Sequence, residues 1–300
     1  MSMSAAPTDA PPAATRPAPA MHLPPPPPSR AIWFGRVVLA FLRRELLEAQ
    51  RYRAAFVTRF VSVALGGLSL VFFARFVGSA PNQHLMPYGG DYLAFGLCGL
   101  VAAELQQIGV SSLANRVRMA QLMGYLEAQL GTPAPAWIIL GAYPVYELGS
   151  ALVRSMLYLT GAALFLGVTF HPNVLTLAIG VPLALATFGG MGLAGAAATM
   201  ITRRSNPLGA ILSGASALLS GVVYPVSILP AWLVAVGRLL PLTHGLEILR
   251  RGLLAGAAPG QVAGSLLALG AFAVGFLGLG VAMFAWALRR ARSDGSLSHF

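Results

Sequence analysis

Long runs of hydrophobic residues dominate this chain and predict its architecture. Each run can cross a hydrocarbon core of about 30 Å, because a helix rises about 1.5 Å per residue. The runs lie at residues 54–77, 92–113, 138–168, 174–200, 207–223 and 261–288. The pattern predicts an all-α integral membrane protein with six transmembrane helices, of which the fifth is the shortest.

The segment at residues 223–256 departs from this pattern. It is too apolar for an exposed loop, yet it contains prolines and ionisable side chains that an ordinary spanning helix does not tolerate. These are Pro225, Pro230, Pro241, His244, Glu247, Arg250 and Arg251. We expect a re-entrant helical hairpin between spans five and six. Irregular backbone at membrane depth persists only where protein or a water-filled cavity surrounds it, so this segment marks a candidate path through the bilayer.

The charged residues of this segment are spaced for contact on one helix face. Glu247 and Arg251 are four residues apart, and His244 lies seven residues before Arg251. Arg250 follows Glu247 by three residues and competes for the same carboxylate. We expect an ionic cluster here.

Polar segments flank the apolar runs. Residues 1–29 hold ten of the 22 prolines and are typical of a disordered cytoplasmic tail. Residues 30–53 place apolar and arginine-bearing faces at helical spacing, which predicts an amphipathic helix on the membrane surface. Residues 114–137 form a cytoplasmic loop with a short helical pattern, either a docking element or a solvated connector. Residues 289–300 form a second cytoplasmic tail.

Composition agrees with a membrane protein, since 56% of the residues are hydrophobic and 10% are charged. All 20 basic residues are Arg, so the phosphate-binding loop that requires Lys cannot form. Any ATP hydrolysis must therefore take place on another polypeptide. The single cysteine, Cys98, lies in an apolar run, can form no internal disulfide, and is interpreted as a small core residue.

The arginines predict the orientation. Fourteen lie on one side of the predicted spans and four on the other, and the richer side is cytoplasmic by the positive-inside rule. The first group comprises seven in residues 1–53 with Arg116, Arg118, Arg203, Arg204, Arg289, Arg290 and Arg292; the second comprises Arg75, Arg238, Arg250 and Arg251. Both termini are therefore expected in the cytoplasm, with the hairpin opening to the outside.

Two ionisable residues fall deep inside predicted spans. Glu104 in span two and Arg154 in span three both lie roughly 10 to 14 Å from the cytoplasmic ends, at about 1.5 Å per residue. As partners they would form either a lining or gating element or a packing clasp. Small residues recur every fourth position in span five and twice in span one, which predicts close helix contact within or between subunits: Gly209, Ser213, Ala217 and Gly221, with Ser62 and Gly66.

Several motifs occur in a characteristic order. They are Gly124-Tyr-Leu-Glu127 with Thr132-Pro133, Asn206-Pro207-Leu208-Gly209, Ser220-Gly221 through Tyr224-Pro225, Leu229-Pro230 with Trp232, and Leu240-Pro241-Leu242-Thr243 with Glu247 and Arg250. With these motifs, residues 32 to 290 resemble the type-2 ABC exporter permeases, the membrane subunits that carry drugs, lipo-oligosaccharides and polysaccharides outward.

The resemblance implies a partner and two sites. It implies a multi-pass protein of the bacterial inner membrane that binds a cytoplasmic ABC ATPase, a second permease copy and membrane lipid, and no nucleic acid. ATP and Mg would bind the ATPase, leaving this chain without cofactor, metal or catalytic residues. The implied coupling residues are Gly124, Glu127, Thr132 and Pro133. The implied outer gate comprises Pro225, Pro230, Pro241, Glu247 and Arg250, and we expect Tyr224, His244 and Arg251 of the same segment to belong to it.

Two other classes of protein are weaker alternatives. An ion-coupled transporter would need several intramembrane carboxylates, and Glu104 is the one deep example. A membrane-embedded transferase would need an acidic metal-binding motif or a histidine cluster, neither of which occurs. The cargo stays open among a lipo-oligosaccharide, a lipid-linked glycan and an amphipathic drug.

Overall fold

The computed structural model describes residues 65–75, 85–124, 136–202 and 207–293, together with Leu39, Arg43 and Val61. The tail at residues 1–29 and most of the predicted surface helix at 30–53 lie outside this part. The described part is helical and contains no strand. Its long helices are α3 (Tyr92–Leu122), α5 (Ala136–Leu166), α6 (Val174–Thr202) and α10 (Ala263–Ser293). Its shorter elements are the helix Leu65–Arg75, α7 (Pro207–Leu219), α8 (Ala231–Gly237) and α9 (Pro241–Leu253), with the 3-10 turns η1 (Met86–Tyr88), η2 (Val226–Ile228) and η3 (Pro259–Val262).

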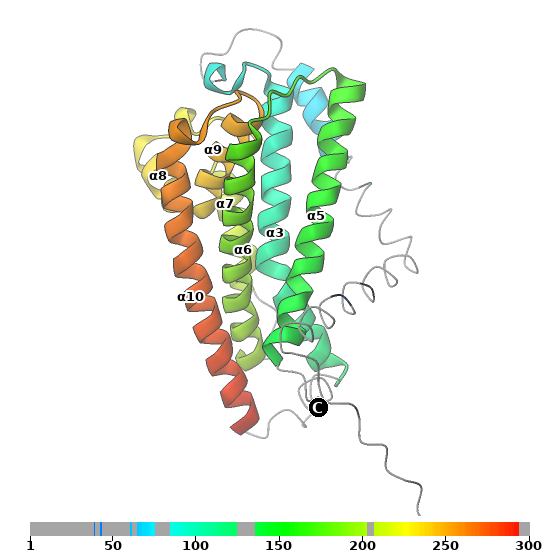
Figure 1. Ribbon diagram of the computed structural model, residues 1–300, viewed down its shortest axis with the longest axis vertical. Helices are drawn as coiled ribbons and strands as arrows, with labels where there is room; N and C mark the ends of the chain where they lie inside the picture. Colours follow the sequence, from blue (N-terminus) through cyan, green and yellow to red (C-terminus); the bar gives the residue numbers. More distant parts are fainter. Residues whose placement is uncertain are drawn as a thin grey trace, which may run out of the picture.

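The long helices run side by side, and α8 and α9 lie at one end of the bundle (Figure 1). We call this the hairpin end. The starts of α3, α6 and α10 lie there, whereas α3 ends at the opposite end of the bundle. In the most apolar stretch of α3, 67% of the residues are buried, against 17% in that of the helix that contains α10. Among the described helices, α3 is therefore central and α10 peripheral.

Glycine contacts hold α6 against both of these helices. A Cβ atom at Gly192 would overlap the carbonyl oxygen of Gly109 on α3, and one at Gly280 on α10 would overlap the carbonyl oxygen of Gly190. Small residues permit this close approach of backbones, as is common between membrane helices. The backbone of α6 therefore lies in close contact with both α3 and α10. In the stripe predicted on α7, Gly209 and Ser213 are buried and Ala217 is half-buried.

Within the described residues, four helices are long and apolar enough to cross a membrane, or five if the bent pair α8–α9 counts as one span. The starts of the predicted second and fourth spans coincide with those of α3 and α6, at residues 92 and 174. The outward-facing side chains of α5 and α10 suit a lipid environment because many are large, apolar and exposed, including Val153, Met156, Leu164, Leu267 and Val274.

The described helix of the predicted fifth span is short. α7 has 13 residues, a length of about 20 Å, and cannot cross the core alone. It ends because Gly221 adopts a left-handed conformation with φ of 70°, and the Val222 amide donates back to the Ala217 carbonyl. Conversely, α3 extends to Leu122, nine residues beyond the predicted end of span two, so the first part of the predicted loop at 114–137 continues this helix.

Candidate functional site

The bent pair of helices lies where the sequence predicts an interrupted segment. α8 and α9 meet at an angle of 90° across a break at residues 238–240. Leu240 is extended, and Pro241 occupies the first turn of α9, where its missing N–H group costs nothing and its fixed φ favours the helix. Pro230 plays a matching part as the residue before α8, and the buried Pro225 precedes η2.

Arg250 is the best-satisfied buried charge at the hairpin end. Its side chain is enclosed, with the residue only 3% exposed. Its guanidinium donates to the carbonyl oxygens of Phe95 at 3.3 Å, Gly221 at 3.0 Å and Val222 at 2.7 Å. It also stacks on the Phe95 ring, 3.4 Å from the centroid. Gly99 makes room for this arrangement, since a Cβ there would overlap the Val222 carbonyl and crowd the guanidinium.

The arrangement suits arginine for an electrostatic reason. Gly221 and Val222 follow the C-terminus of α7, where unpaired carbonyl groups concentrate partial negative charge. The fork of donors on a guanidinium can serve several such oxygens at once. Arg250 thereby joins α9 to the start of α3 and the end of α7.

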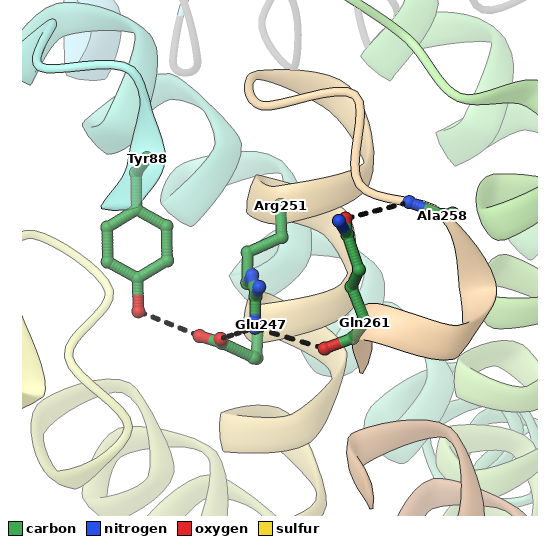
Figure 2. Close-up of polar contacts among 5 residues, drawn as sticks. All are labelled: Tyr88, Glu247, Arg251, Ala258 and Gln261. Atoms are coloured by element: carbon green, nitrogen blue, oxygen red, sulfur yellow. Dashed lines mark hydrogen bonds and ion pairs between the residues drawn. The ribbon is translucent and has the colours of Figure 1, made fainter. Parts of the chain in front are cut away.

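Glu247 forms the centre of a second polar network, shown in Figure 2. Its carboxylate accepts a hydrogen bond of 2.7 Å from the Tyr88 hydroxyl and lies 3.5 Å from Arg251 Nη1. Arg251 donates to the Gln261 carbonyl at 3.2 Å, and the Gln261 side chain accepts from the Ala258 amide at 3.1 Å. The network therefore connects η1, α9 and η3.

Two details of the expected ionic cluster are wrong. Arg250 does not compete for Glu247, because the described hydrogen bonds of its guanidinium go to backbone carbonyls on neighbouring helices. His244 does not join Arg251 either. Its Nε2 atom lies 2.9 Å from the Arg238 carbonyl, and its ring is tilted against Phe272. Helical spacing proposes partners on one helix, whereas tertiary packing offers these side chains closer ones.

Tyr88 is held in its protonated form. Burial raises the pKa of its phenol, and the negative charge and hydrogen bond of Glu247 raise that pKa further. The hydroxyl therefore stays a donor to Glu247 throughout the physiological pH range.

A third set of bonds fastens the end of α9 to the start of α6. The backbone N–H of Asn173 donates to the Gly252 carbonyl at 2.8 Å. The side-chain oxygen of Asn173 accepts from the backbone N–H of Thr176 at 3.1 Å and so caps α6. The Thr176 hydroxyl donates to the Ala257 carbonyl at 2.7 Å. The Tyr224 hydroxyl donates to the Leu218 carbonyl near the end of α7.

Glu104 and Arg154 meet between α3 and α5. Arg154 Nε lies 3.2 Å from Glu104 Oε1, and the side chains are 5% and 17% exposed for Arg154 and Glu104 respectively. Arg154 also donates to the Ser150 hydroxyl at 3.1 Å. The contact is separate from the hairpin network.

Of the proposed coupling residues, Gly124 alone falls in the described part. It follows the end of α3 with φ of 70°, a backbone conformation that favours glycine. Glu127, Thr132 and Pro133 lie outside the described residues.

Comparison with known families decides the class of protein. Residues 36–254 match the family described as ABC-2 type transporter, a range that contains the motifs around α7, α8 and α9. The chain belongs to the ABC-2 type transporter family. Its membership makes this chain a membrane component of a transporter that associates with an ABC ATPase, and the chain itself is not the catalytic component. No curated protein matches it.

Sequence analysis did not identify several residues that hold the hairpin end of this ABC-2 type transporter. They are Tyr88, Phe95, Gly99, Asn173, Thr176 and Gln261. Each lies in or beside an apolar run, and all except Gln261 have a partner that is distant in the sequence. Only Asn173 carried a local signal, because an Asn before an apolar run is a common helix cap.

Proposed function

We propose that this chain is the permease of an ATP-binding cassette exporter of the bacterial inner membrane. It moves an amphipathic or lipid-linked substrate outward, such as a lipo-oligosaccharide, a glycan or a drug. A separate cytoplasmic ATPase, which binds ATP and Mg, supplies the energy. The observation that carries the proposal is the family match over a segment whose bent helix pair lies at one end of an apolar bundle.

The proposed arrangement has six crossings, both termini in the cytoplasm and a second copy of the chain as partner. α8 and α9 enter the membrane from the outside and turn back, supported by their apolar sequence and their 90° bend. The short α7 would reach the inner surface through residues before Pro207. Glu127 and the neighbouring Thr132 and Pro133 would face the ATPase from the inner side, with Gly124 ending the helix that leads to them.

Reconstitution of the permease with its ATPase tests the proposal. The chain and its partner ABC ATPase are coexpressed, copurified and placed in lipid vesicles. We expect ATP-dependent movement of a fluorescent glycolipid or amphipathic drug, which stops when the ATPase carries a substitution in its phosphate-binding loop. Movement driven equally well by an ion gradient without ATP would instead support a secondary transporter.

Glu127 provides a sharper test of coupling. Glu127→Ala should lower both transport and the stimulation of the ATPase while membrane insertion is unchanged. Wild-type transport and ATPase stimulation in Glu127→Ala would remove Glu127 from the coupling site.

A further inference from the structure

The two halves of the hairpin are attached to the bundle very differently. α9 packs against α3, α6, α7 and α10. Its buried positions are Pro241, Leu242, Leu246, Ile248, Arg250 and Gly252. The Arg250 guanidinium binds it to α3 and α7, while Asn173 and Thr176 bind its C-terminal end to α6. α9 is thus fixed from both sides.

The contact with α6 leaves little room for sliding. A Cβ atom at Gly180 on α6 would overlap the side chain of Ile248. A Cβ atom at Gly252 would lie 3.2 Å from the side chains of Thr176 and Leu177, which is closer than ordinary van der Waals contact. Interlocked surfaces of this kind move as units, because close-packed interiors do not deform continuously.

α8 has few such attachments. Gly237 is its one buried residue, and its main neighbour within the described residues is α7. Trp232 on α8 is 68% exposed, and Val236 is also exposed. A helix with few buried apolar contacts has low local stability and is a natural moving element.

The break between the helices has the features of a hinge. Residues 238–240 absorb the 90° change of direction. Two side chains of the first turn of α9 hold it: Thr243 Oγ1 lies 2.6 Å from the Gly237 carbonyl oxygen, and His244 Nε2 lies 2.9 Å from that of Arg238. Both contacts join residues six apart in the chain, and Thr243 Oγ1 also lies 2.9 Å from the Ser220 hydroxyl oxygen just after α7. None of these bonds involves the residues that anchor α9 to α3 and α6.

We propose that α8 and α9 form the outer gate of the export path, with α9 as its fixed half, α8 as its moving half and the hinge at residues 238–240. Arg250 and Asn173 are then positioning residues that hold α9. The charged side chains of α9 stay in place while α8 moves. The inference rests on the proposed export function, since it names the part of the same site that moves.

A disulfide between α9 and α6 tests the fixed half. The Cβ position of Gly245 lies 4.0 Å from Ala184 Cβ, within the range that a disulfide requires. Gly245→Cys and Ala184→Cys are combined in a Cys98→Ser background, which removes the single native thiol. We expect oxidised and reduced proteins to transport at the same ATP-dependent rate. Loss of transport on oxidation and recovery on reduction would overturn the inference.

The design separates two kinds of failure. Each single cysteine variant, treated with the same oxidant, shows any effect of the substitution itself. If the reduced double variant and the unmodified chain both lack ATP-driven transport, the proposed function fails. If they transport and the cross-linked form does not, the assignment of α9 as the fixed half fails alone.

Distance measurements test the moving half. Spin labels are placed at Val274 on α10 and at either Trp232 on α8 or Ala255 just after α9, all exposed positions, with excess unlabelled chain so that few dimers contain two labelled copies. ATP with the partner ATPase should shift the Trp232–Val274 distance and leave the Ala255–Val274 distance unchanged. A shift of Ala255 equal to that of Trp232, or no shift of Trp232 during transport, would contradict the proposal.

Discussion

Arg250 shows how a buried cation can be stabilised without an adjacent carboxylate. Its guanidinium binds three backbone carbonyls, of which two belong to the turn after α7, and an aromatic face. These groups supply oriented dipoles in place of water, so the charge is solvated by the fold. Arg251, one residue along, is 33% exposed in its side chain and contacts Glu247 within a helical turn. We therefore expect the two neighbouring arginines to contribute very differently to the free energy of unfolding.

Substitution of these two arginines should separate their roles. Arg250→Gln leaves two or three buried carbonyls without a donor, which lowers the free energy of unfolding by about 1 to 3 kcal/mol for each unsatisfied group. Arg251→Gln removes a partly exposed pair worth about 0.3 to 0.5 kcal/mol. Thermal unfolding in detergent should show a much larger fall in Tm for Arg250→Gln. Equal values of Tm would show that the three carbonyl contacts are not important for stability.

Tyr88 predicts a pH dependence. Because the pKa of its phenol is raised in the folded protein above the ordinary tyrosine value of 10.0, the folded state keeps a proton that the unfolded state loses above that pH. The contribution of Tyr88 to the free energy of unfolding is complete below pH 10.0 and is lost as the pH rises toward the pKa of the folded state. Chemical unfolding on either side of pH 10.0 should show less alkaline destabilisation in Tyr88→Phe than in the unmodified chain. The same alkaline slope in both would exclude Tyr88 as its source.

At the scale of elements, close backbone packing sets the position of α6. Gly192 faces the Gly109 carbonyl so closely that a methyl group would overlap it, whereas Gly189 on the same helix faces open space. The pair provides a test with a built-in control, since both substitutions to Ala raise helix propensity by the same amount.

Gly192→Ala should destabilise the protein by about 1 to 3 kcal/mol through overpacking. Gly189→Ala should be neutral or stabilising by up to about 1 kcal/mol. Thermal unfolding and the yield of monodisperse protein measure both. A Tm for Gly192→Ala at or above that of Gly189→Ala would show that α3 and α6 can separate without loss.

The Glu104–Arg154 pair between α3 and α5 either packs the two helices together or lines the transport path, and substitutions can distinguish these roles. Arg154→Met leaves the Glu104 carboxylate mostly buried and unpaired, with a cost of about 3 to 5 kcal/mol in the fully buried limit. Adding Glu104→Gln should recover most of that stability. If the double variant also transports normally, the pair is a packing clasp; if stability returns without transport, the pair lines or gates the path. No gain in Tm on adding Glu104→Gln would show that the pair is not energetically coupled.

At the scale of the whole molecule, the direction of α3 places the hairpin end and Gly124 at opposite ends of the bundle (Figure 1). Orientation in the membrane can therefore be read from two single cysteines in a Cys98→Ser background. An impermeant maleimide should label Trp232→Cys in intact cells and Met123→Cys only after lysis, since both positions are exposed. The reverse labelling would invert the proposed topology.

The sequence by itself determined the membrane class, the helical fold and the interruption after α7. These follow from local physics: apolar runs need lipid or a core, Pro241 begins a helix, and Gly221 ends a turn without strain. The motifs around Pro230 and Pro241 indicated the resemblance to exporter permeases. The family match over residues 36–254 confirms that resemblance.

Spacing along α9 predicted the contact of Glu247 with Arg251, but only the tertiary structure decided which side chains on different elements meet at the hairpin end. Arg250 and Phe95 are 155 residues apart, Tyr88 and Glu247 are 159 apart, and no periodicity in the sequence relates them. It also decided that α7 is short, because a run of small apolar residues continues smoothly past the point where the Gly221 turn stops the helix. Spacing along one helix suggests neighbours at three and four residues, but a buried charge takes whichever dipoles the packed helices bring within reach.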